Sequence, residues 1–184
     1  VSSIDIAPTI LDFAGIEIGQ NYQGKSFKYL LEKPDEPFRN FVFAEHNWHD
    51  YESHQRMVRN KDFMYIENNR NQYAQRGPLD AINSDSYASL LKKLESGDIS
   101  EVQKEIFISP RPKEEFYELN EDLFQRTNLI DDEKYQKNIN SLRMILNQWK
   151  DETGDSQPDQ ITKDWFEKRP GPKGKEAKTK KDLP

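Results

Sequence analysis

Residues 41 to 68 constrain the fold more than any other stretch, because short runs of strand-forming residues alternate there with polar clusters. The runs lie at 41–44, 56–59 and 63–66, and runs of this kind broken by polar clusters are typical of strands. Asn60-Lys61-Asp62 predicts a tight turn between the last two runs, since Asn and Asp tolerate turn geometry. The stretch therefore predicts an antiparallel sheet with a polar loop at one end.

The predicted loop holds the candidate binding residues. All three histidines of the chain, His46, His49 and His54, lie in it, and loops on a rigid scaffold often carry function. His46, Asn47 and His49 are candidates to bind a hydroxyl-bearing or anionic ligand, because neutral imidazole donates and accepts and imidazolium pairs with anions. The alternative is that these groups only satisfy nearby backbone atoms. We expect His54 to be structural.

Arg56 has two interpretations. Its guanidinium could bind an anionic ligand through two parallel hydrogen bonds, or it could form a salt bridge with Glu45 or Glu52. A zinc site built from the three histidines is a weaker hypothesis, because no Cys or carboxylate completes a known ligand spacing. We therefore expect neither a metal ligand nor a catalytic residue in this chain. The predicted substrate-binding residues are His46, Asn47, His49 and Arg56.

Residues 3 to 14 predict a strongly apolar helix. Ile6, Ile10 and Phe13 recur at three- and four-residue spacing, with Leu11 beside them, and Gly15 is a natural helix end. Little sequence precedes this helix. We therefore expect its partners to lie upstream, and these four apolar side chains to be exposed in the present chain.

The longest predicted helix spans residues 133 to 152 and ends at Gly154. Its apolar positions form one stripe: Tyr135, Ile139, Leu142, Ile145, Leu146 and Trp149. Shorter helices are predicted at 26–32, 85–95 and 100–107, and a strand at 115–119. The predicted fold class is α+β, with a small antiparallel sheet packed against the long C-terminal helix.

Composition excludes several classes of function. The formal charge is −6, and residues 163 to 184 contribute +4, so the rest of the chain carries −10; an acidic body does not suit non-specific binding of nucleic acid. The chain has no Cys, hence no disulfide and no thiol chemistry. No run approaches the ~20 apolar residues of a membrane helix. The sequence begins at Val1 without a Met, which we interpret as an excised fragment.

Two segments resemble type I sulfatases. VSSIDIAPTILDFAGI followed by QGKSFKYLL is similar to the family pattern S-x-x-D-x-x-P-T-x-L-x-x-A-G that precedes a G-x-S-L loop. Residues 115–119, Asp122 and Asn128-Leu129 resemble the closing motif E-L-Y-D-L-x-x-D-P-x-E-x-x-N-L. The chain departs from that motif at Leu123 and Gln125, where the family has Pro and Glu to shape a turn.

The subgroup is narrowed by AEHNWHDYESHQRMVR, SPRPKEEFYEL and WKDETGD, which are similar to heparan N-sulfatases (sulfamidases). The resemblance covers roughly residues 1 to 165. It implies that residues 1–33 end an absent α/β main domain of the alkaline-phosphatase type, and that 34–154 form the C-terminal subdomain. Residues 155–184 are expected to be a polar, basic tail. In this family the loop that matches His46 to His49 faces the substrate pocket. The resemblance therefore implies that His46, Asn47 and His49 contact sugar hydroxyls or a sulfate, and that Arg56 could bind a sulfate or a uronic carboxylate.

The resemblance also implies a function for the longer parent protein. Sulfatases hydrolyse sulfate esters or sulfamates with a formylglycine, made from Cys or Ser in C/S-x-P-x-R, beside a calcium ion. This chain has no Cys, and Ser109-Pro110-Arg111 is one residue short of that spacing. We therefore expect the fragment to be inactive alone and to complete the fold and line the substrate pocket. Its expected partners are the missing N-terminal catalytic domain and a sulfated glycan.

Heparan-type N-sulfoglucosamine is the expected substrate, and the expected location is periplasmic or secreted. A function of another class remains open at this point. The chain could instead be a non-catalytic carbohydrate-binding or oligomerisation module.

Overall fold

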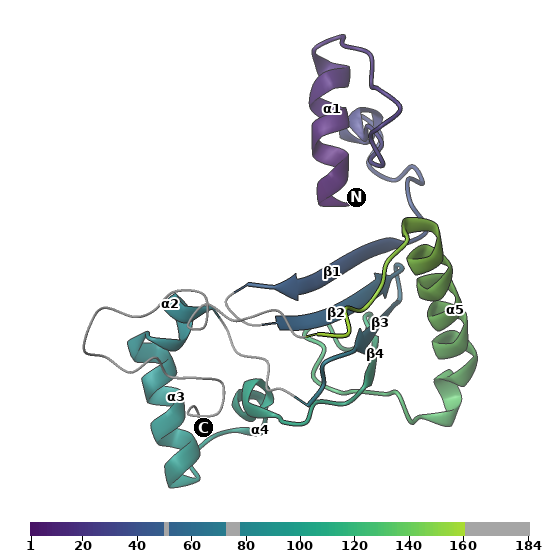
Figure 1. Ribbon diagram of the computed structural model, residues 1–184. Coiled ribbons are helices and arrows are strands. Elements are labelled where there is room, and N and C mark those ends of the chain that lie inside the picture. The colour runs from purple at the N-terminus through teal and green to yellow at the C-terminus, as the bar shows by residue number, and fades with distance from the viewer. Residues whose placement is uncertain (50–51, 73–77, 161–184) are drawn as a thin grey trace.

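The computed structural model describes residues 1–49, 52–72 and 78–160 (Figure 1). Its elements follow one another along the chain as η1 (Ser3–Asp5), α1 (Ile6–Phe13), η2 (Lys28–Leu31), β1 (Val42–Trp48), β2 (Glu52–Arg59), β3 (Phe63–Asn68), α2 (Leu79–Ile82), α3 (Asp85–Ser96), α4 (Glu101–Lys104), η3 (Glu105–Phe107), β4 (Glu114–Glu118), η4 (Glu133–Tyr135) and α5 (Gln136–Thr153). Among the described residues, no helix has the length and apolar content needed to cross a membrane.

The four strands form one antiparallel sheet in the order β1-β2-β3-β4, which confirms the predicted sheet. The β2–β3 turn is built as predicted: the Asn60 N–H donates to the Phe63 carbonyl at 3.0 Å, and the Asn60 side-chain oxygen accepts from the N–H groups of Asp62 and Phe63. The predicted loop before β2 was too long. β1 reaches Trp48 and β2 begins at Glu52, because the pairing extends through polar residues with weak strand propensity.

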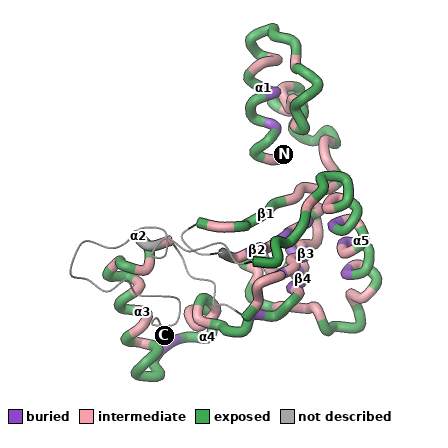
Figure 2. Tube along the Cα trace, in the orientation of Figure 1, coloured by how far each residue is buried: buried purple, intermediate pink, exposed green. Residues whose placement is uncertain are grey.

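Helix α5 packs against one face of the sheet and closes the core. The predicted stripe on α5 is confirmed, since Ile139, Leu142 and Leu146 are buried. Figure 2 shows the buried positions of α5 and of the strands facing one another. At the edge of the core, the rings of Phe43 and Trp149 stack with centroids 5.1 Å apart. The remaining members of the buried cluster come from β2, β3 and β4: Val58, Tyr65 and Phe116.

Helix α1 and the loop after it form a unit beyond the β1 edge of the sheet (Figure 1). The carboxylate of Asp5 is the hub of this unit, because it accepts hydrogen bonds from three separate parts of the chain. It accepts from the backbone N–H groups of Ser2 and Lys25, both at 2.8 Å, and pairs with Arg39 through two hydrogen bonds. Asp5 is 0% exposed, so this carboxylate joins the start of α1 to the chain that leads into the sheet.

The apolar side chains of α1 face away from this hub. Ile6, Ile10 and Phe13 are 53%, 61% and 57% exposed, which confirms the prediction for these three. Leu11 is half-buried, so its predicted exposure was wrong. The division into domains at residues 33 and 154 stays a prediction. Of the predicted tail, 155–160 are described and 161–184 lie outside the described residues.

The shorter helices follow local signals. Ser84 caps α3, Gly97 ends it at φ +75°, and Ser100 with Gln103 forms the capping box that begins α4. Two predictions of α-helix are corrected. Within 26–32 only the 3-10 turn η2 forms, and within 100–107 the α-helix lasts four residues before η3.

Candidate functional site

The predicted binding residues gather at one end of the β1–β2 pair. His46 and Asn47 lie in β1 and His49 directly follows it, and all three are exposed. β1 forms one edge of the described sheet. The structure therefore brings three of the four predicted residues to one accessible sheet edge.

Different side chains support His46 and Asn47. The Nδ1 atom of His46 lies 3.2 Å from the side-chain oxygen of Gln55, the residue opposite it on β2. The Asn47 amide donates to Glu45 at 3.4 Å. Glu45 in turn lies 3.8 Å from a guanidinium nitrogen of Arg56, which is opposite it on β2. Each exposed polar group is thus backed by a partner in the sheet.

Arg56 is an interior residue, only 1% exposed. Its Nε and Nη2 atoms donate to the two carboxylate oxygens of Asp155 at 2.7 and 2.6 Å, and Nη1 donates to the Gln55 carbonyl at 2.8 Å. The hydrogen bond from Arg56 lowers the pKa of Asp155, although partial burial opposes the shift. This geometry favours the salt-bridge interpretation, with Glu45 as a more distant partner, while ligand contact by Arg56 stays a prediction.

His54 lies in β2 and is buried. It has φ +47°, an uncommon backbone conformation for a non-glycine residue. One ring nitrogen lies 3.1 Å from the Asn69 amide nitrogen and the other 3.4 Å from the Ser156 carbonyl oxygen. His54 therefore joins β2 to the residue after β3 and to the segment after α5, which fits the structural role expected of it.

The residues present do not fit the calcium or formylglycine site that the resemblance implies for the parent protein. In the part of the chain that the structure describes, no three His, Cys, Asp or Glu side chains are grouped so that they could hold a metal ion. Arg111 of the short Ser-Pro-Arg sequence pairs with the buried Glu115 at 3.1 Å and with Glu105 at 2.5 Å. Its guanidinium is therefore part of the interior.

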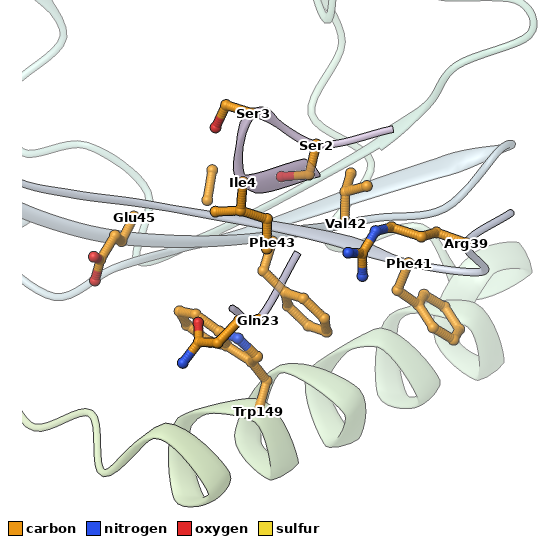
Figure 3. A pocket seen from close by; sticks show the side chains of 11 residues that line it. Ser2, Ser3, Ile4, Gln23, Arg39, Phe41, Val42, Phe43, Glu45 and Trp149 are labelled. Carbon is orange, nitrogen blue, oxygen red and sulfur yellow. The ribbon is translucent and has the colours of Figure 1, made fainter. Parts of the chain in front are cut away.

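A pocket of about 350 Å³ that the sequence did not predict lies along the outer edge of β1 (Figure 3). Residues 41–45 form one side and residues 2–4 the other, with the Phe43–Trp149 stack and Gln23 also lining it. Arg39 reaches into it while paired with Asp5. Sequence reasoning missed this pocket, because its walls are separated by tens of residues and carry no shared local pattern.

Comparison with known proteins gives one family match and several relatives. Residues 1–74 match the family described as N-sulphoglucosamine sulphohydrolase, C-terminal. The chain is 29% identical to an ulvan-active sulfatase of Formosa agariphila over 157 residues, which cover 84% of this chain and 26% of that protein. It is 27% identical to an arylsulfatase of Clostridium perfringens over 77% of this chain and 21% of that protein. The chain thus spans about a quarter of the length of these relatives.

Solved structures share the fold. A 2-O GAG sulfatase superimposes with a TM-score of 0.56 at 20% identity, over 87% of this chain and 27% of that structure. A sulfatase in complex with its substrate, D-glucosamine-2-N,6-O-disulfate, superimposes with a TM-score of 0.54 at 22% identity, over 85% of this chain and 25% of that structure. By sequence and by fold, this chain resembles the C-terminal part of a sulfatase.

Proposed function

We propose that this chain is the C-terminal part of an enzyme that hydrolyses sulfate esters or sulfamates of a sulfated glycan. The match of residues 1–74 to the C-terminal family of N-sulphoglucosamine sulphohydrolases carries the proposal, and the sulfatase relatives support it. The same match makes heparan-type N-sulfoglucosamine the proposed substrate. Periplasmic or secreted location is part of the proposal, because it rests on the family resemblance.

The role of the chain in that enzyme is to complete the fold and to line the substrate pocket. His46, Asn47 and His49 supply hydrogen-bonding groups at an exposed sheet edge, as sugar recognition requires. Calcium and formylglycine would both reside in the N-terminal catalytic domain, since the residues described here do not fit them. The exposed apolar face of α1 supports a covering domain, because exposed apolar patches commonly mark interaction surfaces.

The experiment compares the purified 184-residue chain with the full-length parent on a panel of sulfated sugars. The panel holds N-sulfated, 2-O-sulfated and 6-O-sulfated glucosamine or uronate derivatives and a small aryl sulfate. We expect sulfate release by the parent, greatest on the N-sulfated sugar, and none by the chain alone. Sulfate release by the chain itself would contradict the assigned role, and a parent inactive on every member would contradict the activity.

One observation also fits the non-catalytic alternative, because an oligomerisation module would expose an apolar helix face such as that of α1. The sequence upstream of Val1 in the parent separates the two. A C/S-x-P-x-R motif there supports the sulfatase, and an unrelated domain supports the alternative. Sedimentation of the 184-residue chain adds a second test, because a stable oligomer of the chain alone favours the module.

A further inference from the structure

We infer that Gln55 and Asn68 are positioning residues that hold His46 in the tautomer with its hydrogen on Nδ1. The His46 ring then presents Nε2 to the solvent as a bare acceptor. The three residues lie directly opposite one another on adjacent strands, His46 against Gln55 and Gln55 against Asn68. Their side chains form a relay across β1, β2 and β3.

The direction of the relay is set at its buried end. One side-chain terminus of Asn68 lies 2.8 Å from the Pro112 carbonyl oxygen and 2.6 Å from an oxygen of Glu115. A backbone carbonyl oxygen can only accept hydrogen bonds, and the same is true of a carboxylate oxygen. The Asn68 atom between them must therefore be the amide nitrogen. Asn68 is 5% exposed, so water does not offer it an alternative arrangement.

Donors contact both side-chain oxygens of Glu115. Two guanidinium nitrogens of Arg111 lie 3.3 and 3.1 Å from the same Glu115 oxygen that Asn68 contacts. The Tyr117 hydroxyl donates to the other oxygen. Burial and this hydrogen bond raise the pKa of Tyr117, so the hydroxyl stays protonated and remains a donor. The acceptor at the buried end is therefore fixed.

The remaining orientations follow one from another. With its nitrogen committed, Asn68 turns its oxygen toward Gln55, whose nearest side-chain atom at 2.5 Å must be the nitrogen. Gln55 then turns its oxygen toward His46 Nδ1 at 3.2 Å. An oxygen acceptor at this position favours a hydrogen on Nδ1, since a neutral imidazole carries its hydrogen on one nitrogen only.

The tautomer of His46 affects how a saccharide is recognised, and this step rests on the proposed function. A neutral His46 with bare Nε2 accepts a hydrogen bond from a sugar hydroxyl or a sulfamate N–H. It has no N–H to offer a sulfate oxygen. His46 thus selects a donor group of the saccharide, and Gln55 and Asn68 set that preference without touching the ligand.

The test is the tautomer of His46 in the ligand-free 184-residue chain, measured by two-bond proton–nitrogen correlation NMR above the titration range of the ring. We expect the Nδ1–H form to dominate in the wild type. Gln55→Glu keeps an acceptor and should keep this form. Gln55→Lys offers only donors and should shift the hydrogen to Nε2. Gln55→Ala removes one hydrogen bond and should lower the Nδ1–H to Nε2–H ratio about 2- to 13-fold. Arg59→Ala, an exposed change on the same face of β2, is the matched control and should leave the ratio unchanged.

A wild-type ring with its hydrogen mainly on Nε2, or a ratio that Gln55→Ala leaves unchanged, would overturn the relay. Neither result touches the proposed sulfatase function. The recognition step is tested separately in the full-length parent, where Gln55→Lys should raise KM for the native glycan at nearly constant kcat, with rescue by Gln55→Glu. If the tautomer reverses and KM does not move, the relay stands and the recognition step is wrong.

Discussion

Arg56 and Asp155 are 99 positions apart in the chain and form a bidentate ion pair. The guanidinium nitrogens Nε and Nη2 lie 2.7 and 2.6 Å from the two carboxylate oxygens. Gly154, at φ +67°, ends α5, and the N–H of Asp155 bonds back to the Lys150 carbonyl. This left-handed helix end turns Asp155 onto β2. The cap of one helix thereby fixes the strand pair that carries His46 and Asn47.

Breaking this pair should destabilise the fold strongly. Removing one partner of a buried pair leaves the other charge uncompensated, which costs about 3–5 kcal/mol. We expect Asp155→Asn to lower the free energy of unfolding by about 3 kcal/mol, near the lower bound because its side chain is 13% exposed. Denaturant unfolding of the chain measures the loss.

Glu101→Gln is the matched control for this experiment. It breaks a pair with Lys104 of similar length, but Glu101 is 86% exposed, and exposed pairs contribute only about 0–1 kcal/mol. Equal losses in the two variants would show that burial of Arg56 does not govern the strength of its ion pair.

The Asp5 hub should make the α1 unit sensitive to acid. Burial alone would raise the pKa of Asp5, but hydrogen bonds from Arg39, Lys25 and Ser2 outweigh it and lower the pKa to about 2. The pKa of Asp5 in the folded unit lies below its value near 3.9 in the unfolded chain, so the ionised carboxylate stabilises the folded unit by about 2 kcal/mol at neutral pH. This stabilisation is lost as the pH falls from about 4 through 2. Hydrogen exchange of α1 amides across this range measures it. Asp5→Asn should exchange faster at pH 7 and lack the acid-dependent change.

Gly24 should not tolerate a side chain. A Cβ at this position would lie 1.9 Å from the Ile4 carbonyl oxygen, so Gly24→Ala must push the loop away from η1. Overpacking of this kind costs about 1–3 kcal/mol. Gly19→Ala is the control, because its Cβ would meet nothing within 4 Å. Faster amide exchange in α1 for the first variant and not the second is the expected result, and equal behaviour would contradict the close approach.

The exposed face of α1 should matter for stability only in the parent, where the proposed catalytic domain would cover it. In the 184-residue chain, Ile10→Ser should change the free energy of unfolding by at most about 0.5 kcal/mol, since Ile10 is 61% exposed. In the parent we expect a loss of about 2–5 kcal/mol, as for truncation of a buried apolar side chain. A parent that tolerates the change as well as the chain does would show that this face stays uncovered.

The binding role of His49 can be separated from a folding role by the size of the substrate. Losing a hydrogen bond to a charged group costs about 1.5–3 kcal/mol, or roughly 10- to 150-fold. In the parent, His49→Ala should lower kcat/KM by that factor on the native glycan and much less on a small aryl sulfate. Arg56→Ala should depress both substrates alike, because Arg56 supports the strands from inside. If His49→Ala lowers kcat/KM equally on the native glycan and on the aryl sulfate, His49 does not contact the glycan.

The sequence by itself determined the four strands, the helices α1, α3 and α5, and their order along the chain. Runs of strand-forming residues broken by polar clusters within 41–68 predicted the strands, and Asn60-Lys61-Asp62 predicted the turn between β2 and β3. The apolar stripe of α5 predicted the face that covers the sheet. These signals are local, since each run of strand-forming residues and each helical stripe lies within a single element. The apolar face of α1 was also predicted from the sequence, because its apolar residues recur at three- and four-residue spacing within one helix.

Only the tertiary structure decided which polar groups meet. Arg39 and Asp5 are 34 residues apart, Asn68 and Glu115 47, and Arg56 and Asp155 99. No local period encodes such pairs, and each arises because buried polar groups must find partners once the apolar faces have packed. The same requirement places Arg56, a predicted substrate-binding residue, in the interior, where its charge holds β2 against the end of α5.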